Sequence, residues 1–117
     1  MFDFEKLQVY QKSKEFNLKI KKDILRIDSL EKTTKDQLWR ASLSIVLNIA
    51  ESTSRFSDAD KKNFYVISRG SLIESIAVLD LMKDEMILSK EQYLEFYNKG
   101  EELSKILYVL IKRLEKK

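Results

Sequence analysis

Apolar residues recur along most of the chain at intervals of three and four positions, which is the period of an amphipathic α-helix. Short polar stretches that contain Ser, Thr and Asp interrupt this pattern. The pattern predicts helices over about residues 3–28, 33–54, 57–86 and 89–115. Long helices with short links pack as antiparallel neighbours, so we expect an all-α, antiparallel up-down-up-down four-helix bundle. A chain of 117 residues forms a single domain of this kind, residues 1–117.

Capping residues mark where the predicted helices start. Ser57 is followed three positions later by Asp60, and Ser89 by Gln92, which is the spacing of reciprocal side-chain and backbone capping. Asp3 precedes the first periodic segment, and we expect it to be the N-cap there.

The first and third predicted helices each carry a second apolar stripe, apart from the stripe that would face the core. One bundle core needs a single stripe per helix, so the second stripes are expected to bury against another chain. The alternative is one wide apolar face with Lys side chains lying along it. The candidate oligomer contacts are Leu7, Leu18, Leu25, Val66, Ile73, Ala77 and Leu81. The sequence therefore predicts a homo-oligomer.

The helix expected at 33–54 is apolar nearly all round, which predicts a heavily buried element. Its polar residues fall into one stripe, which consists of Arg40, Ser44, Asn48, Glu51 and Arg55. This stripe is either the only wet strip of the helix or a buried hydrogen-bonded ladder. In the third helix, Gly70 costs about 1 kcal/mol relative to Ala. We expect a close backbone approach there, to the second helix or to a neighbouring chain, beside the small side chain of Ser71.

The composition excludes several classes of chemistry. The chain contains no His, no Cys and no Pro, and only two Gly. Zinc sites, thiol nucleophiles and imidazole bases are therefore excluded, and hairpin-rich folds are disfavoured. The most apolar stretch, 41–50, is too short to span a membrane. No signal peptide is visible in the sequence, so a cytoplasmic location is expected.

Two carboxylates, Glu51 and Glu74, suggest a remote enzymatic alternative, because paired carboxylates can perform acid–base chemistry. Metal-binding helical bundles also use His, which this chain lacks. Nearby Arg residues would satisfy both carboxylates more simply through ion pairs. We therefore interpret Glu51 and Glu74 as structural and expect a protein that is not an enzyme and has no cofactor or metal.

Basic residues supply the only sign of an external partner. The net charge is +3, and the positive charge gathers toward the two ends of the chain. The candidate nucleic-acid contacts are Lys12, Lys19, Lys22 and Arg26 in the first helix, and Lys112, Arg113, Lys116 and Lys117 in the fourth. Solvation and complementarity to the helix dipole are the alternative explanation. Four aromatic residues of the last helix are expected to lie in the core rather than to stack on bases: Tyr93, Phe96, Tyr97 and Tyr108.

Several segments resemble a known family, the four helix bundle proteins that are also called 23S ribosomal RNA intervening-sequence proteins. Residues 37–51 resemble the signature Q-x-x-R-A-x-x-S-I-x-x-N-I-A-E-G, although Ser52 stands where the final Gly is usual. Residues 4–12 are similar to F-x-x-L-x-V-W-x-K, and residues 70–74 to the G-S-x-x-E part of A-x-G-S-x-x-E. Arg55 and Phe64 fit a third motif between them.

The resemblance implies a homo-oligomer, often a five-membered ring of bundles. It also implies kinship with the accessory proteins of diversity-generating retroelements, which bind nucleic acid and a reverse transcriptase. Together with the residues, it suggests a non-enzymatic oligomer that binds RNA or DNA weakly and without sequence preference. The alternative is a protein-interaction scaffold with no nucleic-acid role, whose partner is another protein. The biochemical role of the plain family members is largely undefined.

Overall fold

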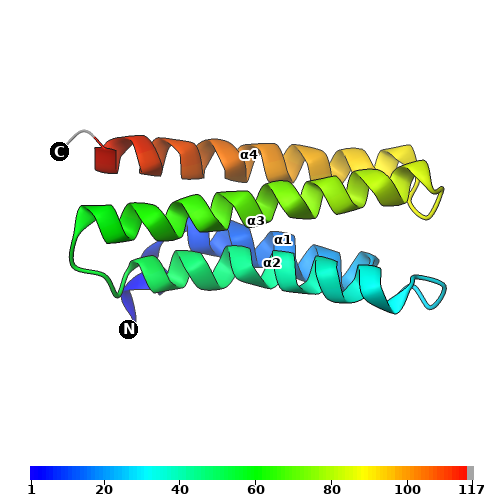
Figure 1. Ribbon diagram of the computed structural model, residues 1–117, viewed down its shortest axis with the longest axis horizontal. Coiled ribbons are helices and arrows are strands. Elements are labelled where there is room, and N and C mark those ends of the chain that lie inside the picture. Colours follow the sequence, from blue (N-terminus) through cyan, green and yellow to red (C-terminus); the bar gives the residue numbers. More distant parts are fainter. Residues whose placement is uncertain (116–117) are drawn as a thin grey trace.

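The computed structural model describes residues 1–115 of the chain. Within these residues there are four α-helices, a short 3₁₀ helix and no strand. The elements are η1 (Asp3–Lys6), α1 (Gln8–Asp23), α2 (Lys32–Ser52), α3 (Asp58–Asp84) and α4 (Lys90–Glu115). The helices lie side by side along the longest dimension of a molecule that measures 46 × 24 × 21 Å (Figure 1). The predicted all-α class with four helices is confirmed.

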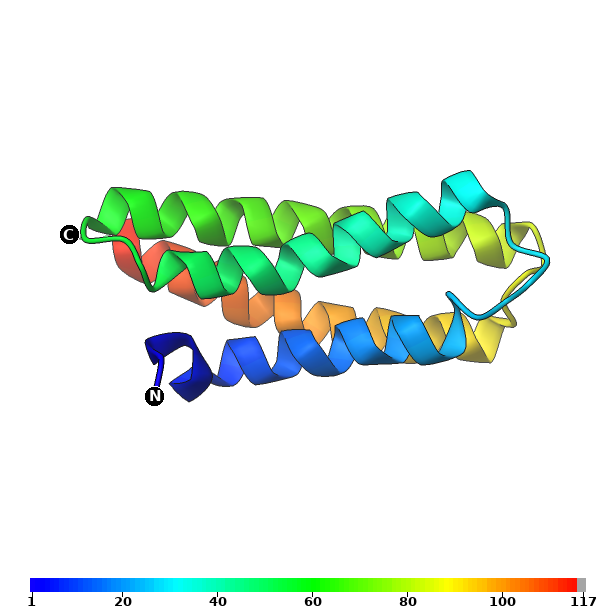
Figure 2. The same cartoon turned by 90° about the horizontal axis from the view of Figure 1, so that it is seen from below.

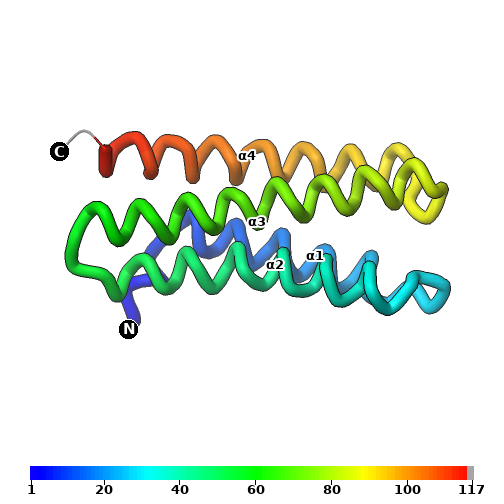
Figure 3. The backbone as a smooth tube through the Cα atoms, viewed as in Figure 1, coloured from blue at the N-terminus to red at the C-terminus, as the bar shows by residue number. Residues whose placement is uncertain are grey.

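The path of the chain determines which helices are neighbours. Successive helices run in opposite directions, so the start of the chain and the end of α4 lie at the same end of the molecule (Figures 1 and 3). α1 packs on α2 and α4, and α3 packs on the same two helices. α1 and α3 are therefore diagonal to each other, and each has one outward side that no other helix covers (Figure 2).

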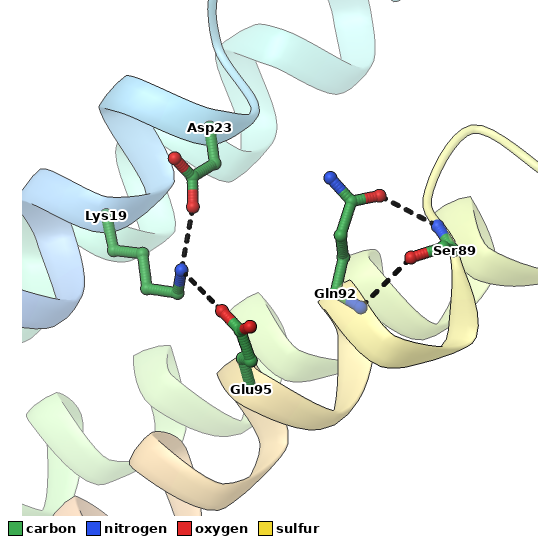
Figure 4. A network of polar contacts seen from close by, with 5 residues as sticks. All are labelled: Lys19, Asp23, Ser89, Gln92 and Glu95. Carbon is green, nitrogen blue, oxygen red and sulfur yellow. Dashed lines mark hydrogen bonds and ion pairs between the residues drawn. The ribbon is translucent and has the colours of Figure 1, made fainter.

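The helix starts follow two of the predicted caps. The Ser57 hydroxyl accepts a hydrogen bond from the backbone N–H of Asp60 at 3.1 Å. At α4, the Ser89 N–H donates to Gln92 Oε1 at 2.9 Å and the Gln92 N–H donates to Ser89 Oγ at 3.1 Å (Figure 4). The single bond at Ser57 and the reciprocal pair at Ser89 satisfy N–H groups that have no partner inside the helix, which explains why both helices begin where predicted.

The first helix is shorter than predicted at both ends. Leu7 is extended (φ −84°, ψ 124°) and separates η1 from α1, so Asp3 is not the N-cap of the long helix. At the other end, α1 stops at Asp23 rather than near residue 28. Ile24 and Leu30 are both buried, so the connection to α2 packs into the core. Its apolar residues therefore mimic a helical pattern in the sequence.

The core lies between the four helices and is built from the stripes expected to face inward. In α1 it contains Val9, Phe16 and Ile20, all of which are buried. The Phe16 ring meets Phe96 of α4 edge to face, with ring centroids 6.1 Å apart. Seven residues of α2 are buried, as its apolar pattern predicts, but Leu47 is 55% exposed on its outer side, so apolar positions of this helix also face solvent.

Candidate functional site

The outward side of α3 exposes four large aliphatic side chains to solvent. Between positions 66 and 81 of α3, the exposed residues are Val66, Ile67, Gly70, Ile73, Glu74, Ala77 and Leu81. At about 100° per residue they fall within an arc of about 120°. We call this set the α3 face. Leu81 is 61% exposed and Ile73 53% exposed, so the four large aliphatic side chains leave much of their surface in solvent.

The α3 face is distinct from the side of α3 that builds the core. Ser68, Leu72, Ser75, Leu79 and Met82 are buried on the opposite side of the helix. The two stripes predicted for this helix are therefore separate, and the alternative of one wide buried face does not describe α3. The candidate contacts Val66, Ile73, Ala77 and Leu81 all belong to the α3 face.

The second stripe of α1 behaves differently. Leu18 is 52% exposed, but Leu7 and Leu25 are partly buried and pack against the chain's own core. The extended backbone at Leu7 and the end of α1 before Leu25 turn these side chains inward. Of the three candidate contacts in this segment, only Leu18 stands out from the surface.

The two glycines have opposite surroundings. A Cβ atom added to Gly70 would meet nothing within 4 Å outside its own helix backbone and neighbouring residues. The expected close approach of Gly70 to the second helix is therefore wrong, because the residue faces outward on the α3 face. Instead, the close approach of two helices occurs at Gly100 of α4, where an added Cβ would lie 2.7 Å from Cδ1 of Ile76. The sequence analysis assigned no role to Gly100.

A row of hydroxyl and amide groups joins α2 to α3 beside the α3 face. The Ser44 and Ser71 hydroxyls are 2.8 Å apart, and the Asn48 amide donates to Ser44 O at 2.8 Å and to Ser44 Oγ at 2.9 Å. Deeper in the bundle, the buried Ser68 hydroxyl donates to the Ile45 carbonyl at 2.8 Å. Ser44, Asn48 and Ser71 are half-buried, so this row lies at the edge of the core rather than inside it.

The charged residues of the polar stripe, together with Glu74 of α3, divide into paired and unpaired residues. Arg55 Nη2 lies 3.3 Å from Glu51 Oε1, and the guanidinium stands over the Phe64 ring at 4.6 Å. By contrast, Arg40 and Glu74 are exposed, and within residues 1–115 neither forms a hydrogen bond or an ion pair. Arg40 and Glu74 are therefore the unpaired residues, and they lie on the other side of the Ser44–Ser71 contact from the Glu51–Arg55 pair.

The geometry does not bring Glu51 and Glu74 together as a carboxylate pair. The Ser44–Ser71 contact fixes how α2 and α3 are aligned, and the two Glu residues lie on opposite sides of it along the bundle axis. At 1.5 Å per residue, their separation along the axis is about 15 Å. Among residues 1–115, no group of three or more His, Cys, Asp or Glu side chains is arranged to hold a metal ion.

Two of the candidate nucleic-acid contacts in α1 are paired with acidic side chains of α4. Lys12 forms an ion pair with Glu102. Lys19 bridges Asp23 at 2.7 Å and Glu95 at 2.9 Å (Figure 4). The hydrogen bond that Lys12 donates to Glu102 raises the pKa of Lys12. The hydrogen bonds that Lys19 donates to Asp23 and, second, to Glu95 raise the pKa of Lys19. With Phe16 and Phe96 beneath them, the pairs Lys12–Glu102 and Lys19–Glu95 form what we call the α1–α4 seam.

The remaining basic candidates lie near opposite ends of the bundle. Lys22 is exposed in the last turn of α1, and Arg26 is exposed in the connection beyond Asp23, so its predicted place in the first helix is wrong. No ion pair holds either one within the described part of the chain. At the other end, Lys112 is 3.5 Å from Glu115 and stands over the Tyr108 ring at 5.4 Å. Arg113 is exposed nearby. The candidates Lys116 and Lys117 lie outside the described residues.

The aromatic residues of α4 are only partly in the core. Phe96 is buried, and Tyr93 is half-buried, where burial raises the pKa of its hydroxyl. Tyr97 and Tyr108 are 42% and 48% exposed, so the expectation that they lie in the core is wrong. Both tyrosines lie on the side of α4 that is next to α3. Tyr97 and Ile73 line a groove of about 340 Å³ between the two helices, and the Arg69 guanidinium stands over the Tyr108 ring at 5.6 Å. Along the described chain, no helix is both long enough and apolar enough to cross a bilayer.

Comparison with known proteins identifies the family. The model of the family described as 23S rRNA-intervening sequence protein matches residues 5–109. The chain belongs to this family. A solved structure that is similar to it is a protein with unknown function from the S23 ribosomal protein family of Bacteroides thetaiotaomicron VPI-5482. The TM-score is 0.83 at 30% sequence identity, over 89% of this chain and 98% of the other. No protein with a curated description matches the chain.

In this 23S rRNA-intervening sequence protein, two segments that carry the family resemblance meet in space. Residues 37–51 lie in α2 and residues 70–74 lie in α3. The hydrogen bond between Ser44 and Ser71 joins them directly. The two segments therefore contact each other where α2 packs on α3, beside the α3 face.

Proposed function

We propose that this 23S rRNA-intervening sequence protein is a non-enzymatic subunit of a homo-oligomer assembled from antiparallel up-down-up-down bundles. The observation that carries the proposal is the α3 face, a largely apolar surface that residues 1–115 leave exposed. Monomeric proteins rarely leave large contiguous apolar patches in water, and such patches are typical of protein contacts. Each Å² of apolar surface removed from water contributes about 25 cal/mol to association, before entropic costs are subtracted.

A ring is the arrangement that we favour for this oligomer. The α3 face and the outward side of α1 and α2, where Leu18 and Leu47 are exposed, lie on different sides of the bundle. Contact between two different surfaces is head-to-tail, and a head-to-tail contact closes into a ring when its rotation divides a full turn. The family resemblance suggests five copies.

A matched pair of valines tests the proposal. Val66, on the α3 face, and Val109, on α4, are both 46% exposed, and they differ in the surface to which they belong. We expect the wild type to have an oligomeric mass by light scattering at micromolar concentration. Val66→Asp should reduce that mass to the monomer, because the contact would bury a carboxylate, whereas Val109→Asp should leave it unchanged. A monomeric wild type, or identical masses for both variants, would contradict the proposal.

Weak, non-specific binding of RNA or DNA is a second candidate function. Two observations favour it: the exposed Lys22 and Arg26 have no acidic partner within residues 1–115, and the family name refers to ribosomal RNA. Lys12 and Lys19 are less available, because acidic side chains of the same chain already hold them. Phosphate contacts should dominate such binding.

The paired and unpaired cations give a sharp test of this second function. Each phosphate contact should contribute about −0.7 to −0.9 to the slope of log affinity against log salt. The double variant Lys22→Glu and Arg26→Glu should flatten that slope, and Arg113→Glu tests the opposite end of the bundle in the same way. Lys12→Gln should change the slope little. If no complex with RNA or DNA forms even at low salt, the protein-interaction scaffold is the better description.

A further inference from the structure

The line along which α1 packs on α2 holds two lysines that are positioned by aromatic rings. Lys14 Nζ stands over the Tyr10 ring at 5.1 Å, and Lys21 Nζ stands over the Trp39 ring at 5.0 Å. Both lysines are exposed, and neither forms an ion pair within residues 1–115. We call these four residues the α1–α2 seam.

The α1–α4 seam shows how the α1–α2 seam differs. In the α1–α4 seam Lys12 and Lys19, which are also seven positions apart, meet Glu102 and Glu95, so a negative charge cancels each positive one. An aromatic ring attracts an ammonium group through its quadrupole but has no net charge. The lysines of the α1–α2 seam are therefore held in place while their positive charge stays available to a ligand.

The side of α2 that is turned to α1 adds positive charge to this seam. The contacts of Trp39 and Ser42 with α1 fix which side this is. At about 100° per residue, the other residues of that side between positions 35 and 46 are Lys35, Leu43 and Val46, none of which is acidic. Lys35 is half-buried and has no ion pair in the described part of the chain. Asp36 lies at the border of this side, where Lys32 holds it at 3.2 Å.

The acidic residues of α1 and η1 are engaged away from the seam. Asp23 is held by Lys19 at 2.7 Å, and Glu15 lines a small cavity of about 70 Å³ at the α1–α4 seam. In η1, Glu5 accepts a hydrogen bond from a backbone N–H at 3.3 Å, and Asp3 lies 4.0 Å from a Lys of the same element. The positive charges of the α1–α2 seam therefore stay without a carboxylate partner within residues 1–115.

Fixed ammonium groups without carboxylate partners suit a ligand whose negative charge repeats along a chain. Lys14 and Lys21 are about 10.5 Å apart along α1. Protein interfaces need an apolar core, and along Gln8–Asp23 Leu18 is the only large apolar side chain that is exposed. Binding of a nucleic-acid backbone needs only cations that displace its counterions. We infer that Lys14 and Lys21 contact the phosphodiester backbone of a bound RNA or DNA strand, supported by the rings beneath them.

This inference rests on the second candidate function, weak binding of RNA or DNA, and assigns that binding to residues that the sequence patterns did not select. Lys12 and Lys19 have the same spacing in the same helix, but their charges are already paired. Because the rings already order Lys14 and Lys21, phosphate contact costs less side-chain entropy there than at a mobile lysine.

Two matched double variants test the inference. Lys14→Gln with Lys21→Gln and Lys12→Gln with Lys19→Gln each remove two positive charges from α1 at the same spacing. Fluorescence anisotropy of a labelled oligouridine measures affinity as the salt concentration is varied. The first double variant should reduce the slope of log affinity against log salt by about 1.4, because each phosphate contact on a single strand contributes about 0.7. The second should leave the slope unchanged.

Trp39 provides a local readout, because it is the only tryptophan of the chain. A phosphate that engages Lys21 changes the surroundings of the indole ring, so bound RNA should alter the Trp39 emission. Lys14→Arg with Lys21→Arg keeps both charges over their rings and should retain the wild-type slope. Circular dichroism checks that all variants keep the helical content of the wild type. RNA that binds without altering the Trp39 emission would contradict contact at the α1–α2 seam.

The titrations are made on the wild type and repeated in Val66→Asp, because a neighbouring copy that covers the outer side of α1 would hide the seam. The comparison of double variants decides in whichever of the two proteins binds RNA. If neither binds RNA at low salt, the second candidate function is overturned together with this inference.

Two other outcomes would overturn the inference alone. RNA binding with the same slope in both glutamine double variants would show that the cations lie elsewhere on the protein. Polyglutamate that displaces the RNA as effectively as unlabelled oligouridine at equal charge concentration would show that the surface suits an acidic protein instead.

Discussion

The α3 face and the α1–α4 seam are both long outer surfaces of the bundle, but their charged residues differ in whether they have a partner. In the seam, Lys12 and Lys19 meet Glu102 and Glu95 of the same chain, above buried aromatic rings. On the α3 face a single carboxylate, Glu74, has no partner within residues 1–115 and stands among exposed aliphatic side chains. One surface is complete in the single chain, and the other has the composition of an interface.

The difference shows why a count of charges is a poor guide to function in this protein. Lys12 and Lys19 belong to one of the two basic ends of the sequence, yet both form ion pairs with acidic residues of the same chain. Exposed ion pairs contribute little to stability, because water and salt screen them and because ordering two long side chains costs entropy. The seam should therefore owe its stability to Phe16 and Phe96 beneath the charges, and this can be tested.

The largest effect is expected from the aromatic pair in the seam. Phe96 is 1% exposed, and Phe96→Ala should lower the free energy of unfolding by about 3–5 kcal/mol through lost burial and a residual cavity. Tyr97→Ala is the matched control, because its ring is 42% exposed on the next position of the same helix. Urea unfolding at one fixed protein concentration measures both. Equal losses for the two variants would show that the seam is not held by its buried rings.

An intermediate effect is expected where the polar row borders the α3 face. Asn48 is half-buried and donates two hydrogen bonds to Ser44, so Asn48→Ala should cost about 0.5–1.5 kcal/mol of stability. Asn98→Ala, at an exposed position of α4, corrects for the higher helix propensity of Ala. If both variants unfold at the same urea concentration, the polar row adds nothing to the stability of the chain.

The smallest effect is expected from the charges of the seam, and it depends on pH. The hydrogen bond from Lys12 lowers the pKa of Glu102 below its ordinary value of 4.5. The stability that this pair contributes is therefore complete above pH 4.5 and is lost as the pH falls through the lower pKa of the folded state. At the alkaline end, Lys12 has a pKa raised above 10.5, so the same contribution is lost as the pH rises through that higher value.

Thermal unfolding of the wild type and of Glu102→Gln across this acidic range measures the effect. The wild type should lose more stability on acidification than the variant, and added salt should reduce the difference. Superimposable acid profiles would mean that the Lys12–Glu102 pair does not influence folding, and the contrast with the α3 face would then rest on packing alone.

Local chemistry made much of the fold predictable. Ser57 and Ser89 could be recognised as helix starts because each cap depends on residues three positions apart. The end of α1 could not, because Ile24 and Leu30 continue an apolar pattern through a connection that is buried but not helical. Tyr97 and Tyr108 were misplaced for a related reason: spacing indicates which residues share a side of α4 but not whether another element covers it.

The sequence by itself determined the four helices, two of their caps and the presence of a second apolar stripe on the third helix. These features depend on residues within one or two turns of each other, where periodicity and capping act. Only the tertiary structure decided that Lys12 and Lys19 are paired with Glu102 and Glu95, that Gly70 is open whereas Gly100 is enclosed, and that Glu74 stands unpaired within residues 1–115. Those outcomes depend on which helices become neighbours and at what height they align, and this is set by packing across the whole core.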